Sequence, residues 1–140
     1  DDKDVFIARK PYTSQADFKR ENLIKFRDQV CKKYLFEDPD KSNTYLLTET
    51  SIPFLPVTAD TINFNGRFAI QLRGLWRSNT MGMGGPFLGF ALVDEPSGQF
   101  YYVEGFTISP GKDQREIMRE LETILYTFQP SGGPLPKQAQ

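Results

Sequence analysis

The stretch that decides the fold is GRFAIQLRGLWRS at residues 66–78. Its large apolar side chains stand on alternate positions, namely Phe68, Ile70, Leu72 and Trp76. A period of two is typical of a strand with one buried face, and the polar residues on the other parity indicate a face that meets water. The stretch therefore predicts a long strand of an antiparallel sheet, with these four side chains on one face.

Turn signals place further strands on both sides of this one. Asn65 and Gly66 precede it, and both residues tolerate the positive φ that a tight hairpin turn requires. Downstream, an apolar run at 87–93 is followed by a turn at 94–98 and by an aromatic segment at 99–108, which predicts a second hairpin. Weaker strand patterns lie at 5–8, 44–52 and 57–62. We expect the strand at 5–8 to come first and the others to form a meander of four or five antiparallel strands.

One helix is expected before the meander. Ser14 and Asp17 can accept hydrogen bonds from the orphan amides of a first turn, so a helix should begin there. Apolar residues then recur at helical spacing over 23–35, which predicts one buried face. The basic residues of this segment, Arg27 among them, are assigned to the solvated face.

A second helix is expected to close the domain. Asp113 and Glu116 form an acidic first turn ahead of apolar residues that continue at helical spacing to Phe128. The Pro- and Gly-rich end of the chain cannot bury a core, so residues 1–129 should form one domain and 130–140 a flexible tail. The expected fold class is α+β, an antiparallel β-meander sheet packed by two helices, with the element order of the photosystem PsbP-like sandwich.

The composition argues against several classes of function. The 140 residues carry 17 Lys and Arg against 18 Asp and Glu, and a net charge of −1 provides no global field for nucleic acid or anionic lipid. Histidine is absent, which removes the usual general base and the commonest transition-metal ligand. Cys31 is the single cysteine, and no apolar run approaches the ~20 residues of a membrane-spanning helix. We expect no metal, no cofactor, no nucleic-acid partner and no transmembrane segment in this chain.

The glycine-rich cluster MGMGGPF at 81–87 is the first candidate site. Successive glycine amides can cradle a phosphate, but that use needs a helix and a Lys after the glycines, and here a strand follows. The cluster is more simply a strand connection with close backbone approach, or a mobile lip in which Met81 and Met83 supply adaptable apolar contacts. We expect positive φ at one or more of Gly82, Gly84 and Gly85, or mobility there.

Trp76 and Glu104 are the other candidates. Trp76, between Arg73 and Arg77, could be an exposed stacking platform, although its phase with the other apolar residues of the strand favours a core position. Glu104 stands on a strand parity that should be apolar, so it should pair with Arg73 or Arg77 or have a raised pKa. The candidate ligand-binding residues are thus Trp76, Arg73, Arg77, Met83, Gly84, Gly85, Phe87 and Glu104.

Several motifs resemble a known family. They are NLIKFRD (22–28), FNGRFAIQLRGLWR (64–77), MGGPF (83–87), VDE (93–95), EGF (104–106) and LETIL (121–125). They resemble the C-terminal half of an uncharacterised family of Bacteroidetes envelope lipoproteins, catalogued only as a domain of unknown function. The resemblance implies a place in the cell envelope, in the periplasm or on the outer membrane, an upstream lipid anchor and a longer protein. It assigns no functional residues.

Two hypotheses of function follow. The first is a non-enzymatic cell-envelope module that binds or scaffolds, contacting another envelope protein or a small ligand through Trp76, residues 81–87 and the aromatic hairpin. The alternative is an enzyme that uses Glu104 with Arg73 and Arg77 on an acidic or sugar substrate. The missing histidines and the absence of an obvious second acid favour binding. A closed salt bridge at Glu104 would favour it further, whereas an open cleft there would favour the enzyme.

Overall fold

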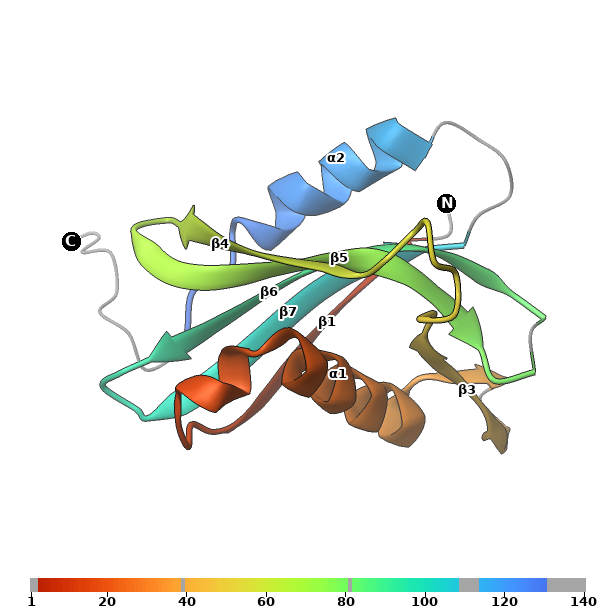
Figure 1. Ribbon diagram of the computed structural model, residues 1–140, viewed down its shortest axis with the longest axis horizontal. Coiled ribbons are helices and arrows are strands. Elements are labelled where there is room, and N and C mark those ends of the chain that lie inside the picture. Colours follow the sequence, from red (N-terminus) through yellow and green to blue (C-terminus); the bar gives the residue numbers. More distant parts are fainter. Residues whose placement is uncertain (1–2, 39, 81, 109–113, 131–140) are drawn as a thin grey trace.

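A computed structural model describes residues 3–38, 40–80, 82–108 and 114–130. In this part of the chain, one curled antiparallel sheet carries a helix on each face (Figure 1). The predicted α+β class is confirmed, but the sheet has seven strands, more than expected. In chain order the elements are β1 (Lys3–Pro11), η1 (Gln15–Phe18), α1 (Arg20–Tyr34), β2 (Phe36–Asp38), β3 (Lys41–Thr48), β4 (Thr58–Phe64), β5 (Arg67–Ser78), β6 (Gly84–Asp94), β7 (Gln99–Thr107) and α2 (Gln114–Leu125).

The strand order is β2-β3-β5-β6-β7-β1, and β4 also pairs with β5. One edge of β5 therefore holds two partners, β4 along its first half and β3 at its end, while β6 covers the other edge. The segment 49–57 leaves the sheet to pass from β3 to β4. At the far side, the first strand of the chain pairs with the last, in register from Lys3 opposite Thr107 to Pro11 opposite Gln99.

The predicted hairpins are confirmed. Asn65 and Gly66 connect β4 to β5 with φ of 54° and 90°, which is the left-handed conformation expected of a two-residue hairpin turn. The turn between β6 and β7 contains Gly98 at φ 68°. Because these turns fix the register of β4, β5, β6 and β7, alternate side chains along each strand point to opposite faces.

Two cores form, one on each face of the sheet. On the face covered by α1, the core includes Leu72, Trp76, Phe87, Phe100 and Tyr102. On the face covered by α2, it includes Phe64, Leu88, Phe90, Leu92 and Tyr101. The run 87–93 is apolar on both parities because both of its faces are covered, and the same holds for much of β7.

The first helix departs from the prediction at its start. Ser14 caps only the short 3₁₀ helix η1, where its Oγ accepts a hydrogen bond from the Ala16 N–H at 3.2 Å. The Asp17 carboxylate accepts a hydrogen bond from the Thr13 N–H at 3.0 Å, on the N-terminal side of η1 and away from α1. The α-helix itself begins at Arg20. Asp113 and positions 131–140 of the predicted tail lie outside the described residues, whereas Pro130 is buried.

Candidate functional site

A fully buried ion pair joins β7 to α1. The Arg27 Nε–H donates to Glu104 Oε1 at 2.6 Å and an Nη2–H donates to Oε2 at 2.8 Å, so the contact is bidentate. Both side chains are fully buried. The Tyr102 hydroxyl donates to the same Oε1 at 2.6 Å, and the third guanidinium nitrogen donates to Thr48 Oγ1 at 3.0 Å. Within this cluster the negative charge of Glu104 balances the positive charge of Arg27, and the donors of Arg27 and Tyr102 bond to acceptors of Glu104 and Thr48.

The surroundings keep Arg27 and Tyr102 in their protonated forms. Burial lowers the pKa of Arg27, but the Glu104 carboxylate and the other neighbouring groups together raise it above its ordinary value, so the guanidinium is charged. Burial, together with the charge of Glu104, raises the pKa of Tyr102 well above its ordinary value and keeps the phenol a donor. The centroid of the Phe87 ring lies 4.0 Å from the guanidinium carbon, so the ring covers one side of the guanidinium. This salt bridge is inaccessible to solvent, and its role is to hold α1 against β7.

The predicted pairing of Glu104 with Arg73 or Arg77 is wrong. Glu104 points to the α1 face, whereas the two arginines stand on the parity of β5 that points to the α2 face. Arg77 instead pairs with Glu49 at 3.1 Å, and Arg73 is exposed. The true partner, Arg27, had been assigned to a solvated helix face.

Trp76 occupies a core position. Its side chain is 2% exposed, its ring meets that of Phe106 edge to face, and its indole N–H donates to the Thr107 carbonyl at 3.0 Å. The stacking-platform alternative therefore does not hold for this tryptophan. A narrow part of the ring still lines a surface groove of about 430 Å³, which we call the Trp76 groove. Its other apolar lining residues include Phe6, Leu35, Leu46, Met83 and Phe106.

The glycine cluster belongs to a strand. Gly84 and Gly85 are the first residues of β6, and neither has the positive φ that was predicted. Gly84 is needed for a different reason: a Cβ atom there would lie 2.8 Å from the Trp76 carbonyl oxygen. The close backbone approach weighed from the sequence is thus confirmed at this position. Met81 lies outside the described residues, and Phe87 is buried beside Arg27.

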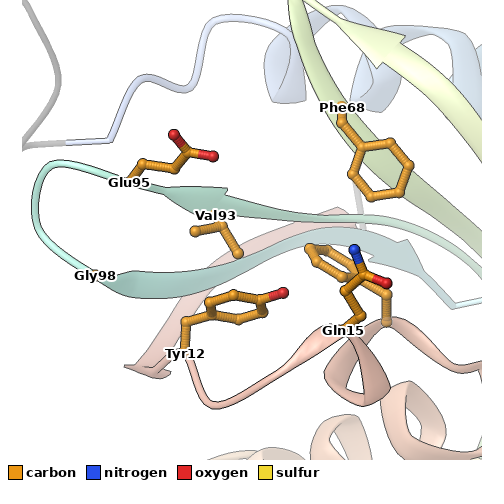
Figure 2. Close-up of a pocket in the computed structure, with 7 residues that line it drawn as sticks. Tyr12, Gln15, Phe68, Val93, Glu95 and Gly98 are labelled. Carbon is orange, nitrogen blue, oxygen red and sulfur yellow. The ribbon is translucent and has the colours of Figure 1, made fainter.

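A larger hollow lies at the opposite end of the same face (Figure 2). We call it the aromatic pocket; its volume is about 610 Å³ and it is lined by Tyr12, Gln15, Phe18, Phe68, Val93, Glu95 and Gly98. In Figure 2, Phe68 approaches from β5 on one side and Tyr12 and Gln15 from the other, with Val93 between them. Three aromatic rings from three separate segments therefore surround one opening.

Neighbouring contacts hold these rings in place. The Phe18 ring meets Phe68 edge to face at 5.2 Å and contacts Tyr12 at 5.9 Å and Phe100 at 5.4 Å, measured between ring centroids. The Tyr12 N–H donates to the Gly98 carbonyl at 2.9 Å, which ties the loop after β1 to the turn after β6. Phe68 nevertheless remains 55% exposed, an unusual state for a large ring on a central strand. The pocket is thus preformed and one of its walls is open to solvent.

Sequence reasoning missed this pocket. Phe68 was predicted to share a face with Ile70, Leu72 and Trp76, which it does, but the face is uncovered at its end. Tyr12 and Phe18 gave no signal because they meet Phe68 only through the folded sheet. The burial of Arg27 could have been predicted from the sequence, because Arg27 stands four residues from both Leu23 and Cys31 and so lies on the same face of the helix as these two buried residues.

The described residues also provide information on metal binding and on membrane-spanning helices. No group of three or more His, Cys, Asp or Glu side chains there is placed to hold a metal ion. None of the helices in the same residues has both the length and the apolar character needed to cross a membrane.

Comparison with known proteins gives a family and no activity. A search of curated proteins finds no match to the chain. A protein-family comparison matches residues 1–127 to a domain of unknown function, DUF4837, which spans β1 through α2. Since the match covers nearly the whole chain, the protein belongs to the DUF4837 family.

Proposed function

We propose that this domain is a non-enzymatic binding module whose ligand site is the aromatic pocket. The observation that carries the proposal is the convergence of Tyr12, Phe18 and Phe68 on one preformed hollow of about 610 Å³. A concave site lined by rings, with a few polar groups at its rim, is the usual form of a small-ligand site. The side chains that line it include neither a nucleophile with a base nor a pair of acids.

The enzyme alternative finds no corresponding arrangement. It required Glu104 to act with Arg73 and Arg77, but Glu104 is sealed against Arg27 and the other two arginines point to the opposite face. A carboxylate that holds a bidentate arginine and a tyrosine hydroxyl without solvent access cannot reach a substrate. The closed salt bridge supports the binding hypothesis.

The lining indicates the class of ligand. The rings offer faces for stacking, and Glu95 is the one charged side chain among the residues that line the pocket. Aromatic faces together with a carboxylate attract organic cations and disfavour anions. We infer that the ligand is a compact apolar or aromatic group that carries a positive charge or a hydrogen-bond donor.

A matched pair of probes tests this proposal. Benzyltrimethylammonium and phenylacetate carry similar rings and opposite charges, and binding of each can be followed by ¹⁵N chemical shifts. We expect the cation to bind more tightly, Phe68→Ala to weaken it about tenfold, and Glu95→Gln to reduce its advantage. Phe54→Ala is the control, because Phe54 is 80% exposed and does not line the pocket. The proposal fails if neither probe shifts the pocket amides or if Phe68→Ala has no effect.

From the resemblance alone, we also propose a place in the cell envelope, as part of a lipoprotein of Bacteroidetes with an upstream lipid anchor. Metabolic labelling of the full-length protein with a fatty acid, followed by separation of membrane and soluble fractions, tests this. Recovery of the unlabelled protein in the cytoplasmic fraction would contradict it.

A further inference from the structure

The outer strand β1 leaves one edge without a partner strand among the described residues. It is nine residues long and pairs with β7 on its other side. Val5 and Ile7 are 44% and 59% exposed on it. Natural proteins normally protect such an edge, because its free N–H and C=O groups can pair with another strand. An exposed apolar edge of this length is a place where a strand can be added.

Two hollows run along this same edge. The Trp76 groove is lined on one side by the consecutive residues Asp4, Val5 and Phe6. A second hollow of about 470 Å³ is lined by Ile7, Ala8 and Arg9. Because successive side chains of a strand point to opposite faces, a hollow that touches three residues in a row reaches the backbone of the strand as well as its side chains. Strand β1, whose outer edge has no partner strand among the described residues, is thus one wall of both hollows.

Helix α1 provides the other wall. Tyr34, which is 65% exposed, lines both hollows and joins them. The second hollow continues along the helix past Phe26, Val30 and Lys33. We call the two hollows together the β1–α1 channel. An open strand edge beside a helix is a known geometry for capturing an extended peptide, in which main-chain hydrogen bonds give affinity and alternate side chains give specificity.

Charge distinguishes the two ends of the channel. Arg9 and Lys33 line the second hollow, and no acidic residue is among the side chains that line it. The Trp76 groove is mostly apolar, with Asp4 at its rim. An acidic side chain would therefore be attracted to the second hollow.

We propose that the β1–α1 channel binds an extended acidic segment of a partner protein as an additional strand. A large apolar side chain of the segment enters the Trp76 groove, and an Asp or Glu lies between Arg9 and Lys33. The runs of β1 that line the two hollows, 4–6 and 7–9, have their middle residues three positions apart, about 10 Å along the strand. Side chains on one face of a strand are separated by an even number of residues, so the two side chains of the segment stand two or four residues apart. The aromatic pocket is a separate site, so this inference is independent of the proposed function.

An array of nine-residue Thr- and Val-rich peptides tests the proposal. Each peptide carries one Phe and one Glu at every spacing from one to six, and a twin array carries Lys in place of Glu. We expect binding at spacings of two or four, weakened about tenfold in the Lys twins. Arg9→Glu should remove that preference because Lys33 remains, and Arg9→Glu together with Lys33→Glu should reverse it. Failure of every Phe and Glu peptide to bind, or equal binding of the two arrays, overturns the proposal.

Backbone methylation shows whether the peptide binds as a strand. We expect N-methylation at every second residue of the best peptide to abolish binding, and methylation at the intervening residues to leave it, because alternate amides of a strand face one neighbour. Loss in both registers or in neither contradicts strand addition. Sedimentation of the free protein is the other check: a dimer dispersed by Ile7→Lys would assign the edge to a second copy and overturn the proposal. Phe68→Ala should leave peptide binding unchanged, which separates this site from the aromatic pocket.

Discussion

The Tyr102 phenol occupies the space that a side chain at position 89 would need. A Cβ atom built on Gly89 would lie 2.1 Å from the Tyr102 hydroxyl oxygen. Gly89 stands opposite Glu104 across the β6–β7 ladder, so the missing side chain lets Tyr102 lie over β6 and donate to Glu104. The glycine is therefore required for space and not for a special φ, since its φ is not positive.

Gly89→Ala should destabilise the domain by about 3 kcal/mol, because the new methyl group displaces a fully buried tyrosine from its hydrogen bond. Urea denaturation measures the change in the free energy of unfolding. In a Tyr102→Ala background, the same Gly89→Ala change should cost about 1 kcal/mol or less, since the clash is gone. An equal cost in both backgrounds would show that Tyr102 is not the obstacle.

Glu104→Gln should cost about 3–5 kcal/mol, because it leaves the buried Arg27 guanidinium without a counter-charge. The double variant Arg27→Met with Glu104→Leu should recover most of that loss, since no buried charge remains. The matched control is Glu120→Gln, which breaks the surface pair with Lys3 and should cost no more than about 1 kcal/mol. A small effect of Glu104→Gln would mean that the ion pair adds little to stability.

Stability should fall in acid through Glu49. Hydrogen bonds from Ser51, followed by the charge of Arg77, lower the pKa of Glu49 from its ordinary value of 4.5. A lowered pKa in the folded state gives stability that is present above the unfolded pKa and is lost as the pH falls through the folded pKa. The difference in free energy of unfolding between the native protein and Glu49→Gln should therefore be largest near pH 7 and shrink below pH 4. A difference that does not vary with pH would contradict this assignment.

Cys31 should be unreactive in the folded protein. Burial raises the pKa of its thiol to about 12, and the side chain is fully buried against the α1-face core. Alkylation by iodoacetamide at pH 8 should proceed only as fast as the domain opens, and should become rapid in urea. Rapid labelling without denaturant would place the thiol at the surface.

The sequence predicted the sheet because its signals are local. Asn65 and Gly66 set one turn by their φ angles, and the apolar run 87–93 has a length and composition that suit a strand buried on both faces. The strand that was not predicted is β2, which is only three residues long and too short to show an alternation. The patterns of β1 and β4 were weak because Val5, Ile7 and several residues of β4 are exposed. Pairing with a neighbour, and not burial, defines these strands.

The buried ion pair and the aromatic pocket were harder to predict, because the residues that form them are far apart in the sequence. Arg27 and Glu104 are separated by 77 positions, and nothing near either residue identifies the other. Alternation did place Glu104 on a buried face, yet it could not show that α1 covers that face while α2 covers the arginines of β5. Phe68 and Tyr12 likewise come to line one pocket only in the folded sheet, where each contacts Phe18.

The segment 49–57, which lies outside the sheet, separates an N-terminal part of the chain from a C-terminal part, and the two parts pair with each other in the fold. Phe54 and Leu55 are 80% and 48% exposed there, and neither residue belongs to a strand. A chain cleaved between them would keep the β1–β7 and β3–β5 ladders and the buried Arg27–Glu104 pair, all of which join one piece to the other. Tyr12 and Phe18 would come from the first fragment and Phe68 and Glu95 from the second. The domain is thus a natural candidate for a split reporter, in which ligand binding occurs only after the two fragments have reassembled.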